Sequence, residues 1–169
     1  LTLAEPPAVT DQQAAAMNYD KDLAAAKEQS YELYDAKNTL DDAKDDYWSN
    51  VGKYAPGFYK RESLEHTWQA AQYTYQNTVQ NFEIKFRTAS NAVADYRQAL
   101  TAKESALSLQ EETFQSMKLK YNQGTISKNA YLDAQDALES AKTDVATAKH
   151  NLFTAYRTYY WALHYGVLN

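Results

Sequence analysis

Apolar side chains follow a regular three-four spacing along two long stretches of this 169-residue chain. The first stretch contains Val79, Phe82, Phe86, Ala89, Val93, Tyr96, Leu100, Leu107, Phe114, Met117 and Tyr121. The second stretch contains Tyr131, Ala134, Leu138, Ala141, Val145, Ala148, Leu152, Ala155, Tyr159 and Ala162. A spacing of about 3.5 residues kept over many heptads is typical of supercoiled helices that share an apolar seam. The sequence therefore predicts two long helices that pair as an antiparallel coiled-coil hairpin.

The break between the two stretches predicts where these helices end and begin. One helix is expected over about 59–121 and the next over about 128–165, with a tip turn at 122–127. Gly124 suits the left-handed backbone position that ends a helix, and Ser127 is a good N-cap for the helix that follows. Both helices should therefore end cleanly at this turn.

A further helix is expected before these two, over about 11–48, because apolar residues again mark one face. That face contains Tyr19, Leu23, Ala26, Leu33, Ala36, Leu40, Ala43 and Tyr47. A short loop at 49–58 contains a Pro-Gly pair, a strong turn signal that ends this helix. Residues 1–10 contain Pro6-Pro7 and are expected to form an extended linker or an ordered outer strap. The fold class is all-α, with residues 11–169 forming one three-helix repeat.

Composition narrows the classes of function. Charged residues make up 23% of the chain and mean hydropathy is −0.71, values that favour an elongated molecule with much surface and little core. The net charge of −5 is spread without a basic cluster, which argues against nucleic-acid binding. The chain has no Cys and no run of about 20 apolar residues of the kind that spans a membrane. Because it begins at Leu1, we expect a mature protein or a fragment.

Alanine recurs at positions that matter for helix packing. On the last helix every seventh residue is alanine, namely Ala134, Ala141, Ala148, Ala155 and Ala162. Others lie off the seam of the preceding helix, namely Ala92, Ala94, Ala99, Ala102 and Ala106. Small residues let helices approach closely, which favours a closed ring in which each helix has a neighbour on both sides. The alternative is that alanine is present only because it is the best helix former.

Residues capable of chemistry are few and scattered. His66, His150 and His164 lie far apart in sequence, and none belongs to a metal-binding motif. Lys103 and Gln110 interrupt the seam, where polar residues usually set helix register. Asp41, Asp42, Asp45 and Asp46 form an acidic patch without the glycine-containing loop of a calcium site. We therefore expect no enzyme activity, no catalytic residues, no metal site and no cofactor.

The tip turn and the residues around it carry a family resemblance. These residues are Tyr121-Asn122-Gln123-Gly124-Thr125-Ile126-Ser127, Tyr131-Leu132-Asp133-Ala134-Gln135, Ala155-Tyr156 and the closing segment 163–166. On this basis the stretch from about 67 to 166 resembles one half-repeat of the TolC-like outer-membrane efflux channel family, an outer membrane factor. The resemblance implies a trimeric or pseudo-sixfold α-barrel of about twelve helices that exports drugs, peptides or proteins, as in type I secretion.

The same resemblance implies partners and site residues. Gly124, Thr125, Ile126 and Ser127 would dock onto a periplasmic adaptor (membrane fusion) protein, which links the tube to an inner-membrane pump. Asp133 matches a position where acidic residues of the family line the aperture, whereas Ala130 stands where a second acid can occur. The implied location is the cell envelope, outside the cytoplasm.

The connection at 49–63 departs from the family pattern because it is too short for a hairpin of transmembrane β-strands. Either those strands were deleted from an outer-membrane or periplasmic protein of a diderm cell, or the protein is a natural relative that lacks them. Aromatic residues are concentrated in this connection. They are expected either to lie at a lipid or partner interface or to pack the tight turn.

The function expected is that of a conduit subunit, and the alternative is a structural or tethering coiled-coil protein of the cell envelope that encloses no channel. A bundle lying on a lipid surface is least favoured, since the polar helix faces lack Lys and Arg enrichment.

Overall fold

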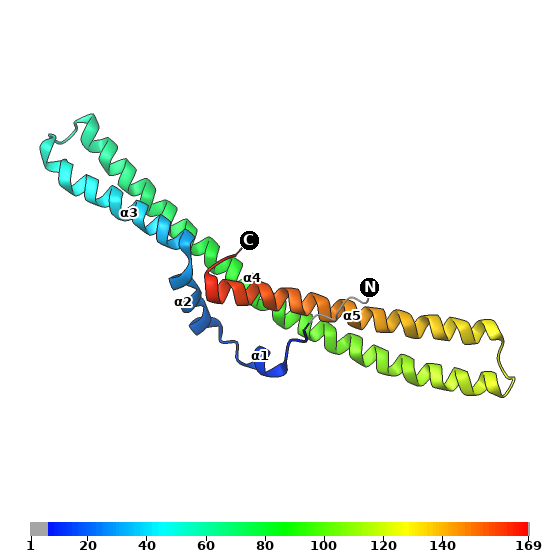
Figure 1. The fold of residues 1–169 in the computed structure, drawn as a ribbon. Helices are drawn as coiled ribbons and strands as arrows, with labels where there is room; N and C mark the ends of the chain where they lie inside the picture. The colour runs from blue at the N-terminus through cyan, green and yellow to red at the C-terminus, as the bar shows by residue number, and fades with distance from the viewer. Residues whose placement is uncertain (1–6, 169) are drawn as a thin grey trace, which may run out of the picture. The chain divides into compact units, whose positions relative to one another are not determined.

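The computed structural model describes residues 7–168 of the chain. These residues form helices α1 (Asp11–Ala15), α2 (Tyr19–Gln29), α3 (Tyr31–Asn50), α4 (Tyr59–Asn122) and α5 (Lys128–Tyr165), with a short 3₁₀ helix, η1 (Val51–Lys53), after α3 (Figure 1). No strand occurs within residues 7–168, so the all-helical class expected from the sequence is confirmed. Of the extended linker expected over 1–10, residues 7–10 have no regular secondary structure, and the rest lies outside the described residues.

The expectation of one continuous helix over 11–48 is wrong, since this segment folds as α1, α2 and α3. The side chain of Asn18 accepts a hydrogen bond from the backbone N–H of Lys21 at 3.1 Å, which caps α2. The hydroxyl of Ser30 accepts one from the backbone N–H of Leu33 at 3.4 Å, which caps α3. Asn and Ser side chains that bond to nearby backbone compete with helix continuation. The apolar periodicity passes through both breaks and therefore conceals them.

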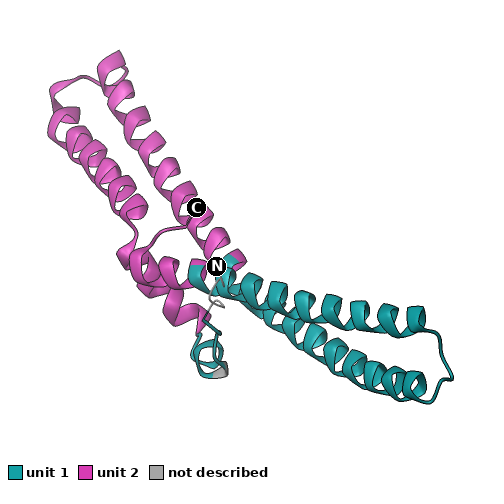
Figure 2. Cartoon of the chain, turned by 45° about the vertical axis from the view of Figure 1, so that its right-hand side comes forward, with its two compact units in different colours: residues 1–17, 89–157 teal, residues 18–88, 158–169 magenta. Residues whose placement is uncertain are grey.

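The chain divides into two compact units, which are coloured separately in Figure 2. Unit 1 comprises Leu1–Met17 and Ala89–Arg157, and unit 2 comprises Asn18–Thr88 and Thr158–Asn169. The first part of α4 and the end of α5 therefore belong to unit 2, whereas the second part of α4 and most of α5 belong to unit 1. Residues 11–169, expected to form a single repeat, are thus shared between two units.

In unit 2, α3 lies beside the first part of α4 and runs antiparallel to it (Figures 1 and 2). The core of this unit consists of aliphatic and aromatic side chains from α2, α3, α4 and α5, namely Ala26, Leu33, Ala71, Phe82, Phe86, Tyr159 and Ala162. Each buried aromatic side chain removes a large apolar area from water and so dominates the stability of a small core. Unit 2 is held together mainly by this group.

A cluster of three rings joins α2, α4 and α5 inside unit 2. The ring of Phe86 lies 5.9 Å from that of Tyr19 and 5.4 Å from that of Tyr159, centroid to centroid. The hydroxyl of Tyr159 donates a hydrogen bond to the carboxylate of Asp22, which also accepts one from the backbone N–H of Asn18 at 2.7 Å. The first turn of α2 is thereby fixed to the end of α5.

The end of α5 approaches the α2–α3 break so closely that only glycine fits. Gly166 has a φ of +61°, and a Cβ atom built there would lie 2.4 Å from both the Cα and the N atoms of Ser30. Ser30 itself is buried, so neither backbone can move aside into solvent. The break in the first helical segment is therefore also a packing site for the end of α5.

In unit 1, the second part of α4 and most of α5 lie side by side and antiparallel (Figures 1 and 2). The buried seam contains Ala89, Val93, Ala134, Leu138, Val145, Ala148, Leu152 and Ala155. Not every residue expected in the seam is buried, since Leu107, Phe114 and Met117 are half-buried and Tyr96 is 41% exposed. Two helices with small side chains on one of them cannot enclose the larger residues completely.

Lys103, one of the two polar residues that interrupt the seam, forms an ion pair across it. Its Nζ lies 2.7 Å from Oδ2 of Asp144 on α5, and both side chains are half exposed. A pairing of this kind favours one alignment of the two helices over others. No helix among the described residues is long and apolar enough to cross a membrane.

Candidate functional site at the α4–α5 turn

The end of α4 has the hydrogen-bond pattern of a Schellman motif. The backbone N–H of Thr125 donates to the carbonyl of Lys120 at 2.9 Å, and the N–H of Gly124 donates to the carbonyl of Tyr121 at 2.9 Å. Gly124 has a φ of +73°, which is the left-handed conformation that this motif requires. The side chain of Thr125 also donates to the carbonyl of Lys120, at 2.8 Å. Several otherwise unpaired carbonyl groups at the helix end are thus satisfied.

The start of α5 is capped in the way expected from the sequence. The hydroxyl of Ser127 accepts a hydrogen bond from the backbone N–H of Ala130 at 3.2 Å, and its carbonyl accepts one from the N–H of Tyr131 at 3.2 Å. The rings of Tyr121 and Tyr131 stack at 4.9 Å, which closes the two helices onto each other just behind the turn. Caps on both sides and this stack hold the turn in one conformation.

The four residues expected to dock an adaptor lie together in this turn. Gly124, Thr125 and Ser127 are exposed, and Ile126 is half-buried. No atom lies within 4 Å of a Cβ built on Gly124, so a partner could approach its backbone directly. Asp133, the aperture candidate, is the sixth residue of α5 and is also exposed, but no hydrogen bond among the described residues joins it to the turn.

Two leucines beside the turn are exposed, of which only Leu132 was named from the sequence, as part of the family motif. Leu119 is 63% exposed on α4, and Leu132 is 41% exposed on α5. Both lie off the apolar seam, so a search for seam positions passes over them. The sequence signal that could have indicated them is a leucine close to the turn at a position outside the seam. Such a leucine does not add to the core, and an exposed large apolar side chain lowers solubility, so its presence there suggests a contact surface. Together they add apolar surface to the polar turn.

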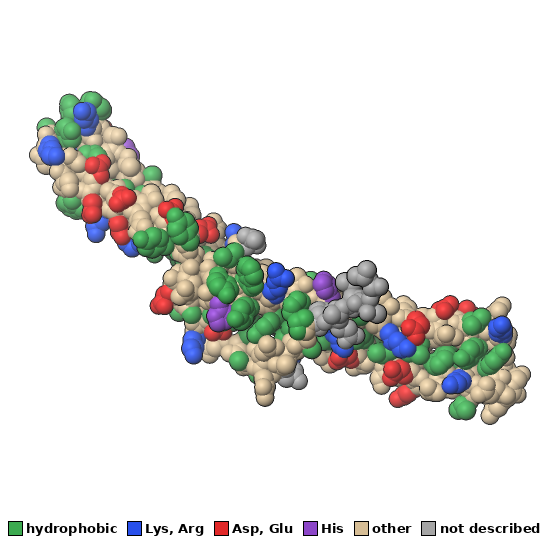
Figure 3. All heavy atoms as spheres, in the orientation of Figure 1, with side chains coloured by type: hydrophobic (Ala, Val, Ile, Leu, Met, Phe, Trp, Pro, Cys, Tyr) green, Lys and Arg blue, Asp and Glu red, His purple; other side chains and the backbone are tan. Residues whose placement is uncertain are grey.

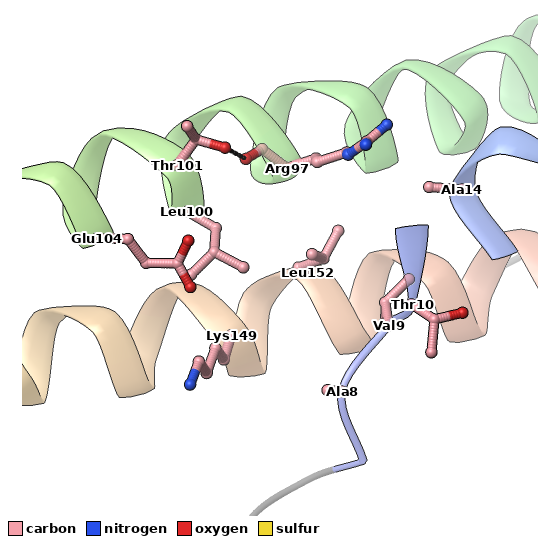
Figure 4. Close-up of a pocket in the computed structure, with 10 residues that line it drawn as sticks. All are labelled: Ala8, Val9, Thr10, Ala14, Arg97, Leu100, Thr101, Glu104, Lys149 and Leu152. Atoms are coloured by element: carbon pink, nitrogen blue, oxygen red, sulfur yellow. Dashed lines mark hydrogen bonds between the residues drawn. The ribbon is translucent and has the colours of Figure 1, made fainter. Parts of the chain in front are cut away.

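A second feature that the sequence did not reveal is a groove in unit 1 of about 490 Å³. Ala8 and Thr10 from the N-terminal segment line it together with Leu100 of α4 and Leu152 of α5, and Figure 4 shows the segment running beside α5 near Leu152. The segment is fixed by a capping box, in which the N–H of Gln13 donates to the Thr10 hydroxyl and the Gln13 side chain accepts from the Thr10 N–H. Residues 8–10 and Ala14 line this groove, whereas residues 1–6 of the segment expected to be a linker or strap lie outside the described residues.

Charged and hydroxyl groups line this groove beside its leucines. Arg97, Glu104 and Lys149 line it together with the two leucines, and no Ser, Cys or His accompanies them. Its two hydroxyl groups make local contacts with the backbone, since Thr10 caps α1 and Thr101 donates to the carbonyl of Arg97 at 3.2 Å. The groove is amphipathic, and its polar groups come from both α4 and α5.

Other ionisable residues are also dispersed. His66, His150 and His164 are exposed, and the ring of His164 packs against that of Tyr160 at 4.1 Å. Within residues 7–168, no group of three or more His, Cys, Asp or Glu side chains is placed to hold a metal ion. The hydrogen bond that Arg87 donates to the Tyr19 hydroxyl raises the pKa of its guanidinium from an already high value, so Arg87 stays charged at every physiological pH.

Comparison with protein-family models, curated proteins and solved structures finds no match to this chain. The family resemblance therefore depends only on the motif residues of this sequence, those around the α4–α5 turn together with Ala155-Tyr156 and segment 163–166.

Proposed function

We propose that this chain is a subunit, or part of one, of a TolC-like efflux or secretion conduit. In this proposal the coiled-coil hairpin formed by α4 and α5 is one repeat of a helical tube, and copies of the chain associate side by side to enclose a channel. The tube passes its substrates without chemistry, and it lies in the cell envelope between an inner-membrane pump and the outside. The residues that resemble the family, from Tyr121 to Gln135, support this assignment.

The observation that carries the proposal is a second apolar stripe on α4 that unit 1 leaves in solvent. Ala99, Ala102 and Ala106 are exposed, and Leu109 in the same register is 66% exposed. Their spacing is three, four and three residues, the same rhythm as the buried seam, and they lie roughly 100° around the helix from it. Helix propensity accounts for the alanines but not for an exposed leucine in register with them. A neighbouring helix would bury the whole stripe.

The α4–α5 turn supports the part of the proposal that concerns the adaptor. Gly124, Thr125, Ile126 and Ser127 are held by caps on both sides and remain accessible. A preorganised turn loses little conformational entropy on binding, so it suits a docking surface. Asp133 is exposed on the same end of α5 and is proposed to face the aperture, where it would favour cations.

Site-specific cross-linking tests the lateral association. Because the chain contains no Cys, Ala102→Cys introduces a single thiol in the stripe, to which a benzophenone maleimide can be attached. We expect ultraviolet light to give a ladder of cross-linked species that stops at a fixed number of copies. Ser108→Cys is the matched control, since Ser108 is exposed but lies on another side of α4, and it should give little product. Equal cross-linking at both positions, or none at either, would contradict the conduit.

The same experiment separates the conduit from the tethering alternative. A tether would bind one partner helix along the stripe and enclose nothing, so its ladder would end at a dimer or stay open-ended. A closed ladder together with a central lumen in negatively stained particles supports the conduit. A closed ladder requires each copy to contact two neighbours, as in a ring with rotational symmetry.

A further inference from the structure

The connection between α3 and α4 has a composition that differs from the rest of the chain. Residues 47–61 contain no acidic residue, whereas the chain as a whole has a net charge of −5. They contain three basic residues, Lys53, Lys60 and Arg61, and five aromatic residues, Tyr47, Trp48, Tyr54, Phe58 and Tyr59. The helical residues on either side are acidic, namely Asp41, Asp42, Asp45, Asp46, Glu62 and Glu65. Positive charge is therefore concentrated at the very end of this helix pair.

The connection is an ordered turn. The segment 55–58 is a type II β-turn, in which the N–H of Phe58 donates to the carbonyl of Ala55 at 3.1 Å and Gly57 has a φ of +80°. The rings of Tyr54 and Phe58 stack at 5.6 Å, and the Lys60 Nζ lies 5.7 Å from the centre of the Tyr54 ring. Stacking and cation–π contacts fix the positions of the aromatic rings relative to the backbone.

Three aromatic side chains of this connection face solvent although others nearby are packed. Trp48 is 62% exposed, Phe58 is 43% exposed and Tyr59 is 66% exposed. Beneath them the rings of Tyr47 and Trp68 pack at 5.1 Å. Figure 3 shows hydrophobic and basic side chains gathered at this end of unit 2, with acidic side chains further along the helices. A preformed apolar surface with a basic rim is thus presented to solvent.

We propose that the α3–α4 connection docks onto the surface of an anionic lipid bilayer. Trp, Tyr and Phe side chains partition to the boundary between headgroups and acyl chains, where Trp48, Phe58 and Tyr59 would insert. Lys53, Lys60 and Arg61 would lie at the level of the negatively charged headgroups. The acidic residues of α3 and α4 disfavour a sideways approach, so the connection meets the bilayer end-on. This contact is peripheral, and it would serve a tether as well as a conduit.

The α4–α5 turn provides an internal comparison. The segment 113–132 also contains three basic residues, Lys118, Lys120 and Lys128, and no acidic residue. There the rings of Tyr121 and Tyr131 stack at 4.9 Å across the two helices, and Tyr121 is 37% exposed, less than Trp48, Phe58 or Tyr59 at the α3–α4 connection. Charge alone thus does not distinguish the two ends of the helices, whereas exposed aromatic surface does. A nucleic acid would be attracted by the cations of both ends. The exposed apolar side chains beside the α4–α5 turn are mainly leucines, Leu119 and Leu132, whereas exposed Trp and Phe rings, which favour the boundary of a bilayer, lie at the α3–α4 connection.

Co-sedimentation of the 169-residue chain with vesicles tests the proposal. Vesicles of phosphatidylcholine containing one third phosphatidylglycerol should bind the protein, and pure phosphatidylcholine vesicles should bind it far less. Lys53→Gln together with Lys60→Gln should weaken binding about 25-fold, since each cation near an anionic surface contributes roughly a 5-fold gain. Phe58→Ser together with Tyr59→Ser should abolish measurable binding, because the apolar contact is lost.

Matched variants elsewhere in the chain serve as controls. Tyr73→Ser with Ile84→Ser removes two similarly exposed apolar side chains from α4, and Lys118→Gln with Lys120→Gln removes two cations from the other end. Both double variants should bind vesicles like the unmodified chain. Equal loss of binding in the controls, or binding to single-stranded DNA but not to vesicles, would overturn the proposal. So would failure to bind vesicles of either composition.

Tryptophan fluorescence locates the contact. The double variant Trp68→Phe with Trp161→Phe keeps Trp48 as the single tryptophan. The substitution at Trp68 removes no hydrogen bond, since the buried Nε1 of Trp68 has no partner among the described residues. Anionic vesicles should shift the Trp48 emission to shorter wavelength, and brominated lipid should quench it. Bound protein whose Trp48 emission does not change would place the contact elsewhere and overturn the assignment.

Discussion

At the scale of single residues, Gly166 is the position where the fold allows least change. We expect Gly166→Ala to lower the free energy of unfolding by about 3 kcal/mol or more, because the new Cβ would meet the backbone of Ser30 at 2.4 Å and the residue must keep a positive φ. Urea denaturation followed by circular dichroism measures this change.

Two other glycines separate the effect of the steric clash with Ser30 from the effect of the positive φ. Gly124→Ala shares the positive φ but meets no atom within 4 Å, so it should cost only about 1 kcal/mol. Gly52→Ala has neither problem and should be close to neutral. If Gly166→Ala and Gly124→Ala proved equally destabilising, the close approach to Ser30 would not be a feature of the folded protein.

Tyr159 is a second residue whose substitution should lower the stability of unit 2. Its side chain is 2% exposed, and its hydroxyl donates to the carboxylate of Asp22. We expect Tyr159→Phe to destabilise the protein by about 2 kcal/mol, since a hydrogen bond to a charged group is lost while the ring packing against Phe86 is kept. Tyr73→Phe, at an exposed tyrosine of α4, is the control and should change the unfolding midpoint very little.

At the scale of elements, the long helices could be predicted and the short ones could not. α4 ends one residue later than expected and α5 has the expected bounds, because both are marked by sustained periodicity and by Gly124 and Ser127. The segment 11–48 was expected as one helix because its apolar face continues across Asn18 and Ser30. Nothing local shows that Ser30 must leave the helix so that Gly166 can pack against it, since that contact joins residues far apart in the chain.

The candidate site also has residues that could be predicted from the sequence and residues that could not. Its turn residues, Gly124 and Ser127, could be predicted because capping is a local property of the backbone. The exposed leucines beside it, Leu119 and Leu132, could not, because exposure depends on how tightly two particular helices pack. The groove beneath residues 8–14 requires a third segment to lie across the helix pair, which periodicity does not encode.

The ion pair between Lys103 and Asp144 gives a prediction about helix alignment. A double-mutant cycle with Lys103→Ala and Asp144→Ala should give a coupling energy of about 0.5 kcal/mol, typical of a half-exposed pair, and 1 M NaCl should reduce it. The pair between Lys142 and Glu139 lies within α5 and serves as the comparison. A coupling near zero for the first pair would mean that Lys103 does not contribute to register.

At the scale of the whole molecule, the proposed tube predicts that one copy is not fully stable alone. The seam between α4 and α5 has alanine at Ala134, Ala148 and Ala155, which bury little apolar area. The residues of the stripe from Ala99 to Leu109 stay exposed within a single copy, and Leu109 is 66% exposed. Association with neighbours would therefore add a substantial part of the stabilising energy, and stability would depend on protein concentration.

This dependence can be measured directly. We expect a 100-fold increase in protein concentration to raise the thermal unfolding midpoint by about 5 °C, since association stabilises the folded form by mass action. Ala102→Glu should remove the dependence, because association would bury an unpaired carboxylate, yet it should leave the dilute protein as stable as before since Ala102 is exposed. Ser108→Glu places the same charge on another side of α4 and should preserve the dependence. A midpoint that stays constant with concentration in the unmodified chain would show that the stripe has no partner among copies of this chain, and the closed tube would then have to be abandoned.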